Sequence, residues 1–379
     1  MGEPETVESI VEMFAQIPDP RIDRTKKYSL EEVLFLVLSA VMSGVNHLTK
    51  IQDFGEVKLD WLRTILPYKN GVPSHDTICR ILGSLEPDIL EQLFIRWMER
   101  AATLEGVVAI DGKTLRGAIR RGEKDSFIHM VSAFSAENGL VYAQVKTDEK
   151  SNEITAIPPL LELLSLNGAI VTIDAAGCQT AITEKLMERG GDYLIAVKGN
   201  QKTLHEDLQL AFHDSDIRNG DDFVSVYETE ELSFGRGEWR KCEVLREPGA
   251  LSHQEKWSHV RTLVRVTSER RLKKDSKPRP FERYYICSIP DLDAKKALEM
   301  TRAHWSIENR LHWQLDVSFR EDECRVSAAN AAENLVVVRH IALNLLRAVE
   351  GLPKGIATRQ NHAAWDDSSR EKIICAGLK

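Results

Sequence analysis

The chain has 379 residues, of which 42% are hydrophobic and 28% charged, and its formal net charge is −8. This composition is typical of a globular protein of two or three domains, and the negative charge argues weakly against a nucleic-acid binder. Six cysteines without CxxC spacing indicate neither a zinc site nor disulfides, so we expect a reducing cytoplasm. We also expect no signal peptide, and the longest apolar run, Val33 to Val45, is too short to span a membrane.

Two local stretches differ from the negative average. Glu269–Arg279 holds six cations against two anions. A second basic cluster, here called the N-terminal basic cluster, consists of Arg21, Arg24, Lys26 and Lys27. Solvated loop charge and contact with a nucleic acid explain both stretches equally well.

Residues 1–100 are predicted to form a compact all-α region of their own. Ser29 followed by Glu32 is a capping box ahead of an apolar run. A second helix begins around His75 and Asp76, where capping chemistry explains both polar residues more simply than a functional role does. Pro87 begins a third helix with apolar residues at helical spacing.

Strand patterns begin after residue 100. Strands are predicted at Val107–Asp111, Ile128–Phe134, Leu140–Lys146, Ala169–Asp174 and Tyr193–Val197. Asn138-Gly139 indicates a hairpin between the second and third strands, and helices are predicted at Ala156–Leu164 and Thr180–Arg189. The resulting order, βββαβαβ, predicts an α/β fold with a mixed sheet and an antiparallel edge.

Residues 213–290 interrupt this pattern with four further strands and charged segments between them. We therefore predict a β-rich insertion rather than more of the core sheet. After Pro290, helices are predicted at Leu292–Phe319 and Asn330–Val349, followed by a polar tail without a clear period. The predicted divisions are 1–100 (helical), 101–212 and 291–350 (the two parts of the core), 213–290 (insertion) and 351–379 (tail).

Two of the predicted strands end in a carboxylate, Asp111 and Asp174, and Gly112 is expected to form a turn after the first. Either acid alone is explained by a solvated side chain at a strand end. If the first and fourth strands are neighbours, the two carboxylates lie side by side and repel each other. A divalent cation removes that conflict, and oxygen ligands favour Mg²⁺ or Mn²⁺ over zinc. Two such ions about 4 Å apart can activate a water and stabilise the leaving oxygen of a phosphodiester.

A third acid, Glu308, lies in the late helix. His304, Glu308 and His312 are four residues apart and share one helix face, which Trp305 and Trp313 flank. The face is explained by substrate contact or by incidental surface charge. A zinc site on the two histidines is disfavoured, because residues eight apart stand about 12 Å apart along a helix.

Several motifs, in this order and spacing, resemble the DDE-type insertion-sequence transposases, and more narrowly the H-repeat-associated group. They are AIDGKTLRGA, EKSNEITAIPPLL, VTIDAAGCQ, YLIAVKGNQ and RAHWSIENRLHWQLDVSFRED. The similarity covers nearly the whole chain, because DPR at Asp19–Arg21 and PSHDT at Pro73–Thr77 resemble the helical region that precedes the catalytic domain in that group.

The resemblance implies a ribonuclease H-like core with Asp111, Asp174 and Glu308 as catalytic and metal-binding residues. It implies a β-rich insertion between the second and third acids, and a cofactor of Mg²⁺ or Mn²⁺, with two ions expected. The implied reaction is cleavage of double-stranded DNA at element ends followed by strand transfer. A homo-oligomer on DNA, no membrane association and a cytoplasmic, nucleoid-associated location in bacteria are also expected.

The chain departs from the wider family around the catalytic glutamate. The family places a Tyr, an Arg and a Lys there, and the corresponding residues here are Thr301, His304 and Leu315. Leucine cannot replace a lysine at a phosphate, so other side chains are expected to contact DNA. The DNA-binding candidates are Lys113, Arg116, Lys198, Asn200, Gln201, Arg302, His304, Trp305, Arg310, His312 and Trp313.

Alternatives remain for some of these candidates and for the function. Lys113 and Arg116 equally fit a basic turn, and core packing is expected for at least one of Trp305 and Trp313. Three function classes are consistent with the sequence: a transposase, a ribonuclease H-like nuclease without strand transfer, and an inactive remnant that still binds DNA or a partner.

Overall fold

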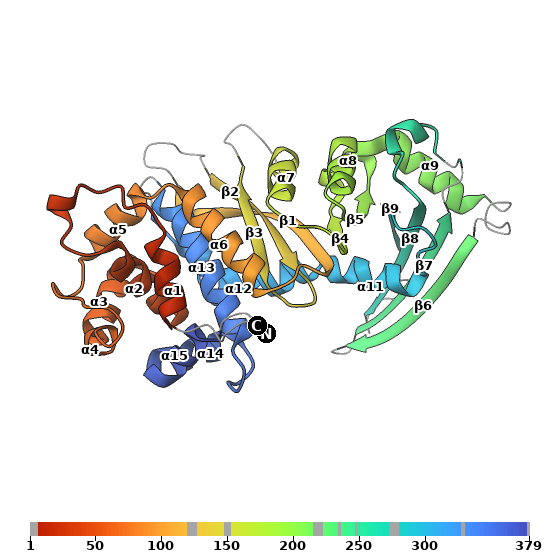
Figure 1. Cartoon of the computed structure of the whole chain (residues 1–379). Helices are drawn as coiled ribbons and strands as arrows, with labels where there is room; N and C mark the ends of the chain where they lie inside the picture. The colour runs from red at the N-terminus through yellow and green to blue at the C-terminus, as the bar shows by residue number, and fades with distance from the viewer. Residues whose placement is uncertain are drawn as a thin grey trace.

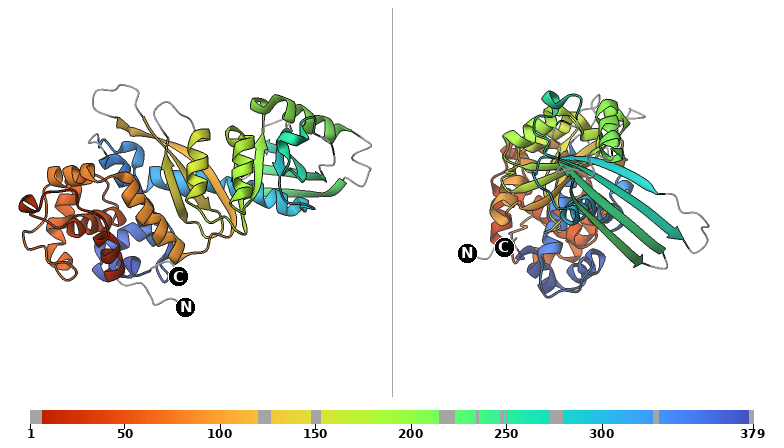
Figure 2. Two further views of the ribbon diagram at one scale, coloured as in Figure 1. Left: turned by 45° about the horizontal axis from the view of Figure 1, so that its top comes forward. Right: turned by 90° about the vertical axis from the view of Figure 1, so that its right-hand side faces the viewer.

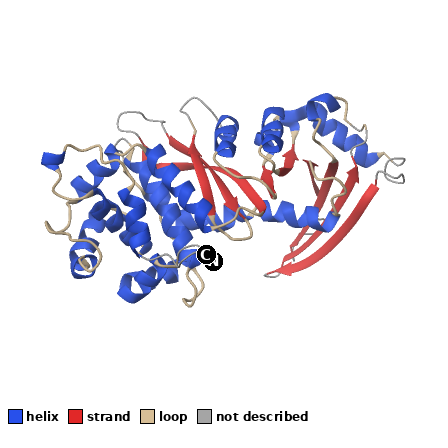
Figure 3. Cartoon of the chain, viewed as in Figure 1, coloured by secondary structure: helices blue, strands red, loops and turns tan. Residues whose placement is uncertain are grey.

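The computed structural model describes residues 7–119, 127–147, 153–214, 223–233, 236–246, 249, 251–272, 280–326 and 330–376. The molecule is elongated, with helices at one end and a sheet that runs through the middle to the other end (Figure 1). Figure 3 shows the same division by secondary structure, with helices also covering parts of the sheet. Within the described ranges, every helix falls short of the length and apolarity that a membrane crossing requires.

The N-terminal helices form much of one end of the molecule. They are α1 (Val7–Ala15), α2 (Leu30–Met42), α3 (Leu48–Val57), α4 (Leu59–Leu62), α5 (His75–Ser84) and α6 (Pro87–Ala101). The predicted capping box is confirmed, since Ser29 Oγ accepts from the Glu32 amide and the Glu32 carboxylate accepts from the Ser29 amide. The apolar run that begins at Val33 is the fully buried α2 helix at the centre of this end.

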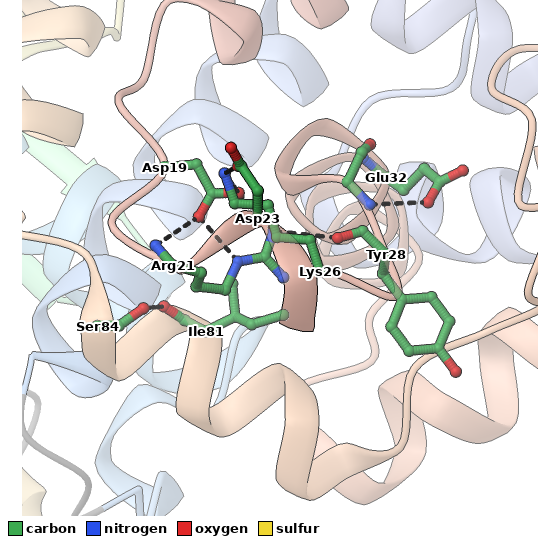
Figure 4. Close-up of polar contacts among 9 residues, drawn as sticks. Asp19, Arg21, Asp23, Lys26, Tyr28, Glu32, Ile81 and Ser84 are labelled. Carbon is green, nitrogen blue, oxygen red and sulfur yellow. Dashed lines mark hydrogen bonds and ion pairs between the residues drawn. The ribbon is translucent and has the colours of Figure 1, made fainter.

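Part of the N-terminal basic cluster closes a loop (Figure 4). Arg21 donates to both carboxylate oxygens of Asp19, at 2.8 and 2.7 Å, and to the carbonyl oxygen of Tyr28 at 3.0 Å. Lys26 Nζ lies 2.7 Å from Asp23 and 3.3 Å from Asp19. These ion pairs give Arg21 and Lys26 a structural role in the loop before α2.

The C-terminal helices complete the helical end of the molecule, where they pack against the predicted all-α region of residues 1–100. Helices α13 (Ala331–Ala348), α14 (Ile356–Trp365) and α15 (Asp367–Ile374) pack beside the N-terminal helices (Figure 2). Asn334 on α13 donates to the carbonyl of Leu82 at 2.8 Å, and Trp61 Nε1 donates to Glu371 on α15 at 2.8 Å. The polar tail therefore forms two helices whose buried faces lie against the N-terminal helices.

Nine strands form one mixed sheet in the order β3-β2-β1-β4-β5-β9-β8-β7-β6. The strands are β1 (Gly106–Ile119), β2 (Phe127–Ser135), β3 (Val141–Lys146), β4 (Ala169–Ile173), β5 (Asp192–Val197), β6 (Phe223–Ser233), β7 (Arg236–Arg246), β8 (Thr262–Leu272) and β9 (Phe281–Cys287). Strand β4 pairs in parallel with β1 on one side and with β5 on the other, and all other neighbouring strands of the sheet pair antiparallel. The predicted mixed sheet with an antiparallel edge is confirmed.

The four later strands continue the core sheet, so their prediction as separate from it is wrong. Strand β9 pairs with β5 over Leu194↔Cys287 to Val197↔Tyr284. The physical reason lies in β9, where residues 284–287 are all buried on both faces, as expected for a central strand and not for an edge. The basic stretch Glu269–Arg279 starts in β8, and its residues 273–279 lie outside the described part of the chain.

Helices cover both faces of the sheet. Helices α7 (Glu153–Glu162), α8 (Thr180–Glu188) and α9 (Lys202–His213) follow β3, β4 and β5, and α9 was not predicted. Helix α11 (Ala294–His304) packs against β1 and β4 and against β6 to β8, and it lies on the opposite side of the sheet from α7 (Figure 1).

The predicted single helix at Leu292–Phe319 is wrong in one respect. Helix α11 is followed by a π-helical segment, η5 (Ile307–His312), and by the short helix α12 (Trp313–Val317). In η5 the Trp313 amide donates to the carbonyl of Glu308, five residues earlier. Short π segments inside helices occur frequently at functional sites.

Candidate catalytic site

Asp111 lies within β1 and not at its end. Gly112 continues the strand opposite Val131 of β2, so the predicted turn at this glycine is wrong. The parallel pairing of β1 with β4, however, runs from Gly106↔Ala169 to Ile110↔Ile173. The parallel pairing therefore ends just before Asp111 on β1 and just before Asp174, which directly follows β4.

Asp174 follows β4 directly, as predicted, and starts the turn η2 (Ala175–Gly177). Its Oδ1 accepts from the amide of Ala176 at 2.9 Å and from that of Gly177 at 3.4 Å. These bonds fix the carboxylate at the mouth of the parallel strands and occupy one of its two oxygens.

Negative charge converges on Asp111. Its pKa is raised to about 7, chiefly by burial and also by the carboxylates of Glu153, Asp174 and Glu308, while a hydrogen bond from the Gly112 amide opposes the rise. The other two predicted acids, Asp174 and Glu308, thus lie near enough to Asp111 to affect its pKa. Among the described residues, no three His, Cys, Asp or Glu side chains are close enough together to hold a metal ion as they stand.

Glu308 lies in the π-helical segment and is exposed to solvent. Partial burial raises the pKa of its carboxyl group. With Asp174, Lys198 and His304 it lines a cavity of about 140 Å³ between α11, β4 and β5. Two of the three predicted acids, Asp174 and Glu308, therefore face this cavity.

The two histidines of the helix face lie beside the acids. His304 Nδ1 is 3.1 Å from Thr172 Oγ1 on β4, and burial lowers its pKa. His312 Nδ1 is 3.7 Å from Asp111 Oδ2, and burial lowers its pKa to about 4, so it is neutral at pH 7.

Glu153 is a fourth acid that the sequence reasoning did not assign. An ideal Cβ built on Gly112 would lie 2.2 Å from Glu153 Oε1, so glycine permits this close approach between β1 and α7. Glu153 Oε1 is also 2.9 Å from His129 Nε2 on β2. The signal was present, because Glu153 lies in one of the motifs that carry the family resemblance, EKSNEITAIPPLL.

Lys113 forms ion pairs with two acids outside the predicted catalytic set. Its Nζ lies 2.6 Å from both Asp316 and Glu321, and its side chain is 11% exposed. Glu321, from the turn η6 (Glu321–Glu323), is fully buried and also lies 3.6 Å from Arg339. The side chains of Lys113 and Asp111 point to the same face of β1, whereas Gly112 faces α7.

The remaining DNA-binding candidates are spread around the cavity. Lys198 is exposed at its edge, while Asn200 and Gln201 donate to the carbonyls of Ala175 and Cys178 and hold the turn η2. Arg302 forms an ion pair with Glu231 at 2.6 Å, and Arg310 donates to the Ala136 carbonyl.

The sequence predicts that at least one of the two tryptophans packs in the core, but both are exposed. Trp305 is 43% exposed and Trp313 is 53% exposed. Leu315 is buried, in agreement with its exclusion as a DNA contact. Arg116 lies in β1, but its side chain is outside the described part of the structure.

Comparison with known families defines the class of protein. The family model described as the transposase DDE domain matches residues 102–345, and the model described as DDE_Tnp_1-associated matches residues 11–98. The chain therefore belongs to the transposases with a DDE domain.

Individual relatives narrow this assignment to the H-repeat-associated group. The chain is 40% identical over 373 residues to "H repeat-associated putative transposase YhhI" of Escherichia coli K12, covering 97% of this chain and 98% of that protein. It is 39% identical over 376 residues to "Putative transposase YncI" of Escherichia coli O157:H7, covering 98% and 95%. The resemblance stated from the motifs is thereby confirmed.

One solved structure is also similar. It is a piggyBac transposase synaptic complex with hairpin DNA, with a TM-score of 0.45 and 11% identity over 97% of this chain and 78% of that chain. This likeness is too low to support an argument about geometry.

Proposed function

We propose that this protein is an active DDE transposase that cleaves DNA at element ends and joins the freed strand to target DNA. The observation that carries the proposal is the placement of Asp111 and Asp174 at the end of the parallel β1–β4 pairing, with the charge of Glu308 acting on Asp111. The order β3-β2-β1-β4-β5 supports a ribonuclease H-like core, in which β6 to β9 extend the sheet beyond β5.

The donor set fits a hard divalent cation, because Asp111, Asp174 and Glu308 all offer carboxylate oxygens. Asp111, Asp174 and Glu308 would hold Mg²⁺ or Mn²⁺, and the Oδ2 atom of Asp174 is not used by the η2 turn. When bound, the metal would supply an activated water and stabilise the charge on the leaving oxygen of the phosphodiester.

The surrounding residues position this site. The η2 turn fixes Asp174, and neutral His312 lies against Asp111 without adding charge. Lys198, at the rim of the cavity, is placed to contact a DNA phosphate. Double-stranded DNA as the partner, assembly of copies on paired ends and a nucleoid-associated location in the cytoplasm belong to this proposal.

The proposal is tested with the variants Asp111→Asn, Asp174→Asn and Glu308→Gln. The substrate is a labelled duplex that carries the DNA flanking the gene, with Mg²⁺ or Mn²⁺. We expect the cleavage rate of each variant to fall more than about 100-fold, because removing a metal ligand reduces activity more than removing a residue that hydrogen-bonds to that ligand. Glu299→Gln, an exposed acid on α11, is the matched control and should cleave like the wild type.

The alternatives give different outcomes in the same assay. Cleavage without joining of the 3′ end to a second duplex indicates a nuclease. DNA binding without cleavage in the wild type indicates an inactive remnant, a class to which the relative named "Inactive transposase YbfQ" belongs by its name. Full cleavage by the Asp111→Asn variant would rule out the proposed acids.

A further inference from the structure

The cavity that holds Asp174 and Glu308 continues into a second cavity. This second cavity, of about 260 Å³, lies between α11 and strands β7, β8 and β9. Arg283, Tyr285, Thr301 and Trp305 line both cavities. Because they share these lining residues, the two cavities form one groove. Helix α11, which contributes Thr301 to both, runs from the core strands to this part of the sheet (Figure 1).

Arg283 lies at the junction of the two cavities. Its guanidinium carbon is 4.9 Å from the centre of the Phe281 ring and 5.5 Å from that of the Trp305 ring. No carboxylate of the described residues lies within ion-pair distance of it. The rings hold the planar group by cation–π contact, and its five N–H donors are left for a ligand.

The second cavity is rich in arginine. Besides Arg283 it is lined by Arg240, Arg270 and Arg302, and among the described residues Glu238 is the single lining carboxylate. Arg240 and Arg302 also contact Glu231, which neutralises part of this charge, so Arg283 is the arginine with the least competition for an anion.

The residues that line the groove indicate the kind of ligand that it binds. Arginines without acidic partners bind phosphate, and the exposed ring of Trp305, which lines both cavities, offers a surface on which a base can stack. The second cavity, at about 260 Å³, lies below the range of about 300–1,000 Å³ that is usual for drug-sized ligands, so it is too small for a duplex and leaves room for no more than a short piece of a single strand.

We propose that this groove binds a single DNA strand where it leaves the acids, and that Arg283 contacts a phosphate of that strand. The inference rests on the proposed function, because the position of the acids defines which end of the groove lies nearest to the cleaved bond. Arg283 then fixes the path of the strand between the cleavage site and strands β7 to β9.

The experiment measures binding of labelled single-stranded oligo(dT) of about 16 nucleotides, a length that an electrostatic single-strand site can span. The protein is the full chain in metal-free buffer, and the readout is fluorescence anisotropy at several salt concentrations. We expect Arg283→Gln to weaken binding about 10-fold, and to reduce the slope of log affinity against log salt by about 0.7, as for one lost phosphate contact.

Lys295→Gln is the matched control. Lys295 is an exposed cation on α11 that lines neither cavity, so its loss removes the same charge without touching the groove. We expect its affinity and salt slope to equal those of the wild type. Equal weakening by the two substitutions, or none by Arg283→Gln, would overturn the proposal.

A blunt duplex of the same length separates the groove from general DNA binding. We expect Arg283→Gln to affect the duplex much less than the single strand, and an equal loss for both would contradict a single-strand site. If the glutamine variant has a lowered melting temperature, Arg283→Lys is used instead, with an intermediate loss of oligo(dT) affinity expected and an unchanged affinity contradicting the proposal.

The outcome is independent of catalysis. Oligo(dT) binding is measured in metal-free buffer, so it does not require cleavage. Failure of cleavage with intact Arg283-dependent binding would refute the proposed function alone, and cleavage without Arg283-dependent binding would refute this inference alone.

Discussion

At the scale of single residues, position along a strand decides what a charged side chain can do. Asp111 and Lys113 are two residues apart on β1 and share a face, but their surroundings differ. Asp111 lies among carboxylates, which raise its pKa, while Lys113 lies between Asp316 and Glu321, which raise the pKa of its ammonium group against burial. Lys113 thereby stabilises the structure behind the acids, whereas Lys198 remains exposed.

Lys113→Met tests this distinction. Removal of the ammonium leaves Glu321 buried with Arg339 as its remaining cation, so we expect a loss of about 3 kcal/mol in stability. The measurements are chemical denaturation and DNA affinity of the folded variant. Lys198→Met is the control, with unchanged stability and weaker DNA binding expected. A stable Lys113→Met protein that binds DNA poorly would show that Lys113 is a DNA contact after all.

At the scale of elements, a buried acid couples helix α6 to the sheet. Glu91 accepts a hydrogen bond from the Gln144 amide of β3 at 3.1 Å. Its pKa is raised to about 8, chiefly by burial, with a smaller contribution from the charges of Asp88 and Glu333. The carboxyl group is therefore protonated in the folded protein at pH 7 and ionised in the unfolded chain.

This difference makes stability depend on pH. Between the unfolded pKa of 4.5 and the folded value of about 8, the folded state holds the proton and the unfolded state does not. The contribution of Glu91 to stability therefore falls as pH rises, by roughly 1 kcal/mol per pH unit. We expect Glu91→Gln, which keeps the acceptor for Gln144, to remove this fall in denaturation curves between pH 5 and pH 8.

Glu99→Gln, an exposed acid on the same helix, serves as the comparison and should retain the wild-type pH dependence. If the Glu91→Gln curves parallel those of the wild type across this range, then Glu91 titrates at its ordinary pKa and the coupling does not exist.

At the scale of the whole molecule, the two ends of the chain share one helical unit. Arg370 on α15 is fully buried, with its guanidinium 4.3 Å from the Trp61 ring and 5.3 Å from the Phe54 ring. It also donates to Asp367 at 2.7 Å. Because α15 follows the catalytic core in sequence, this contact ties the C-terminus to the N-terminal helices.

Arg370→Ala should loosen this attachment. We expect a loss of roughly 2–3 kcal/mol from the cation–π contacts and the packing of the side chain. Limited proteolysis should then cut the segment between α13 and α14, detected by mass spectrometry. Lys372→Ala, an exposed cation on the same helix, should resist cleavage like the wild type. Equal resistance of both variants would mean that α15 is held by other contacts.

Local patterns in the sequence were sufficient for much of this protein. The capping box at Ser29, the start of α6 at Pro87 and the strands around Asp111 and Asp174 depend on neighbouring residues, so they could be predicted. Helix α9 was missed although Leu204, Leu208, Ala211 and Phe212 repeat at helical spacing and are buried. The family motifs identified the class of protein because they keep their order over the whole chain.

The tertiary structure decided what depends on contacts between distant segments. Pairing of β9 with β5 joins the later strands to the core sheet, and packing of α13 to α15 completes the helical end. The approach of Glu153 to Gly112, the burial of Lys113 and the meeting of Arg283 with Trp305 likewise bring together residues far apart in sequence. Sequence patterns record the burial and turn preferences of nearby residues, whereas these contacts arise only when the whole chain has packed.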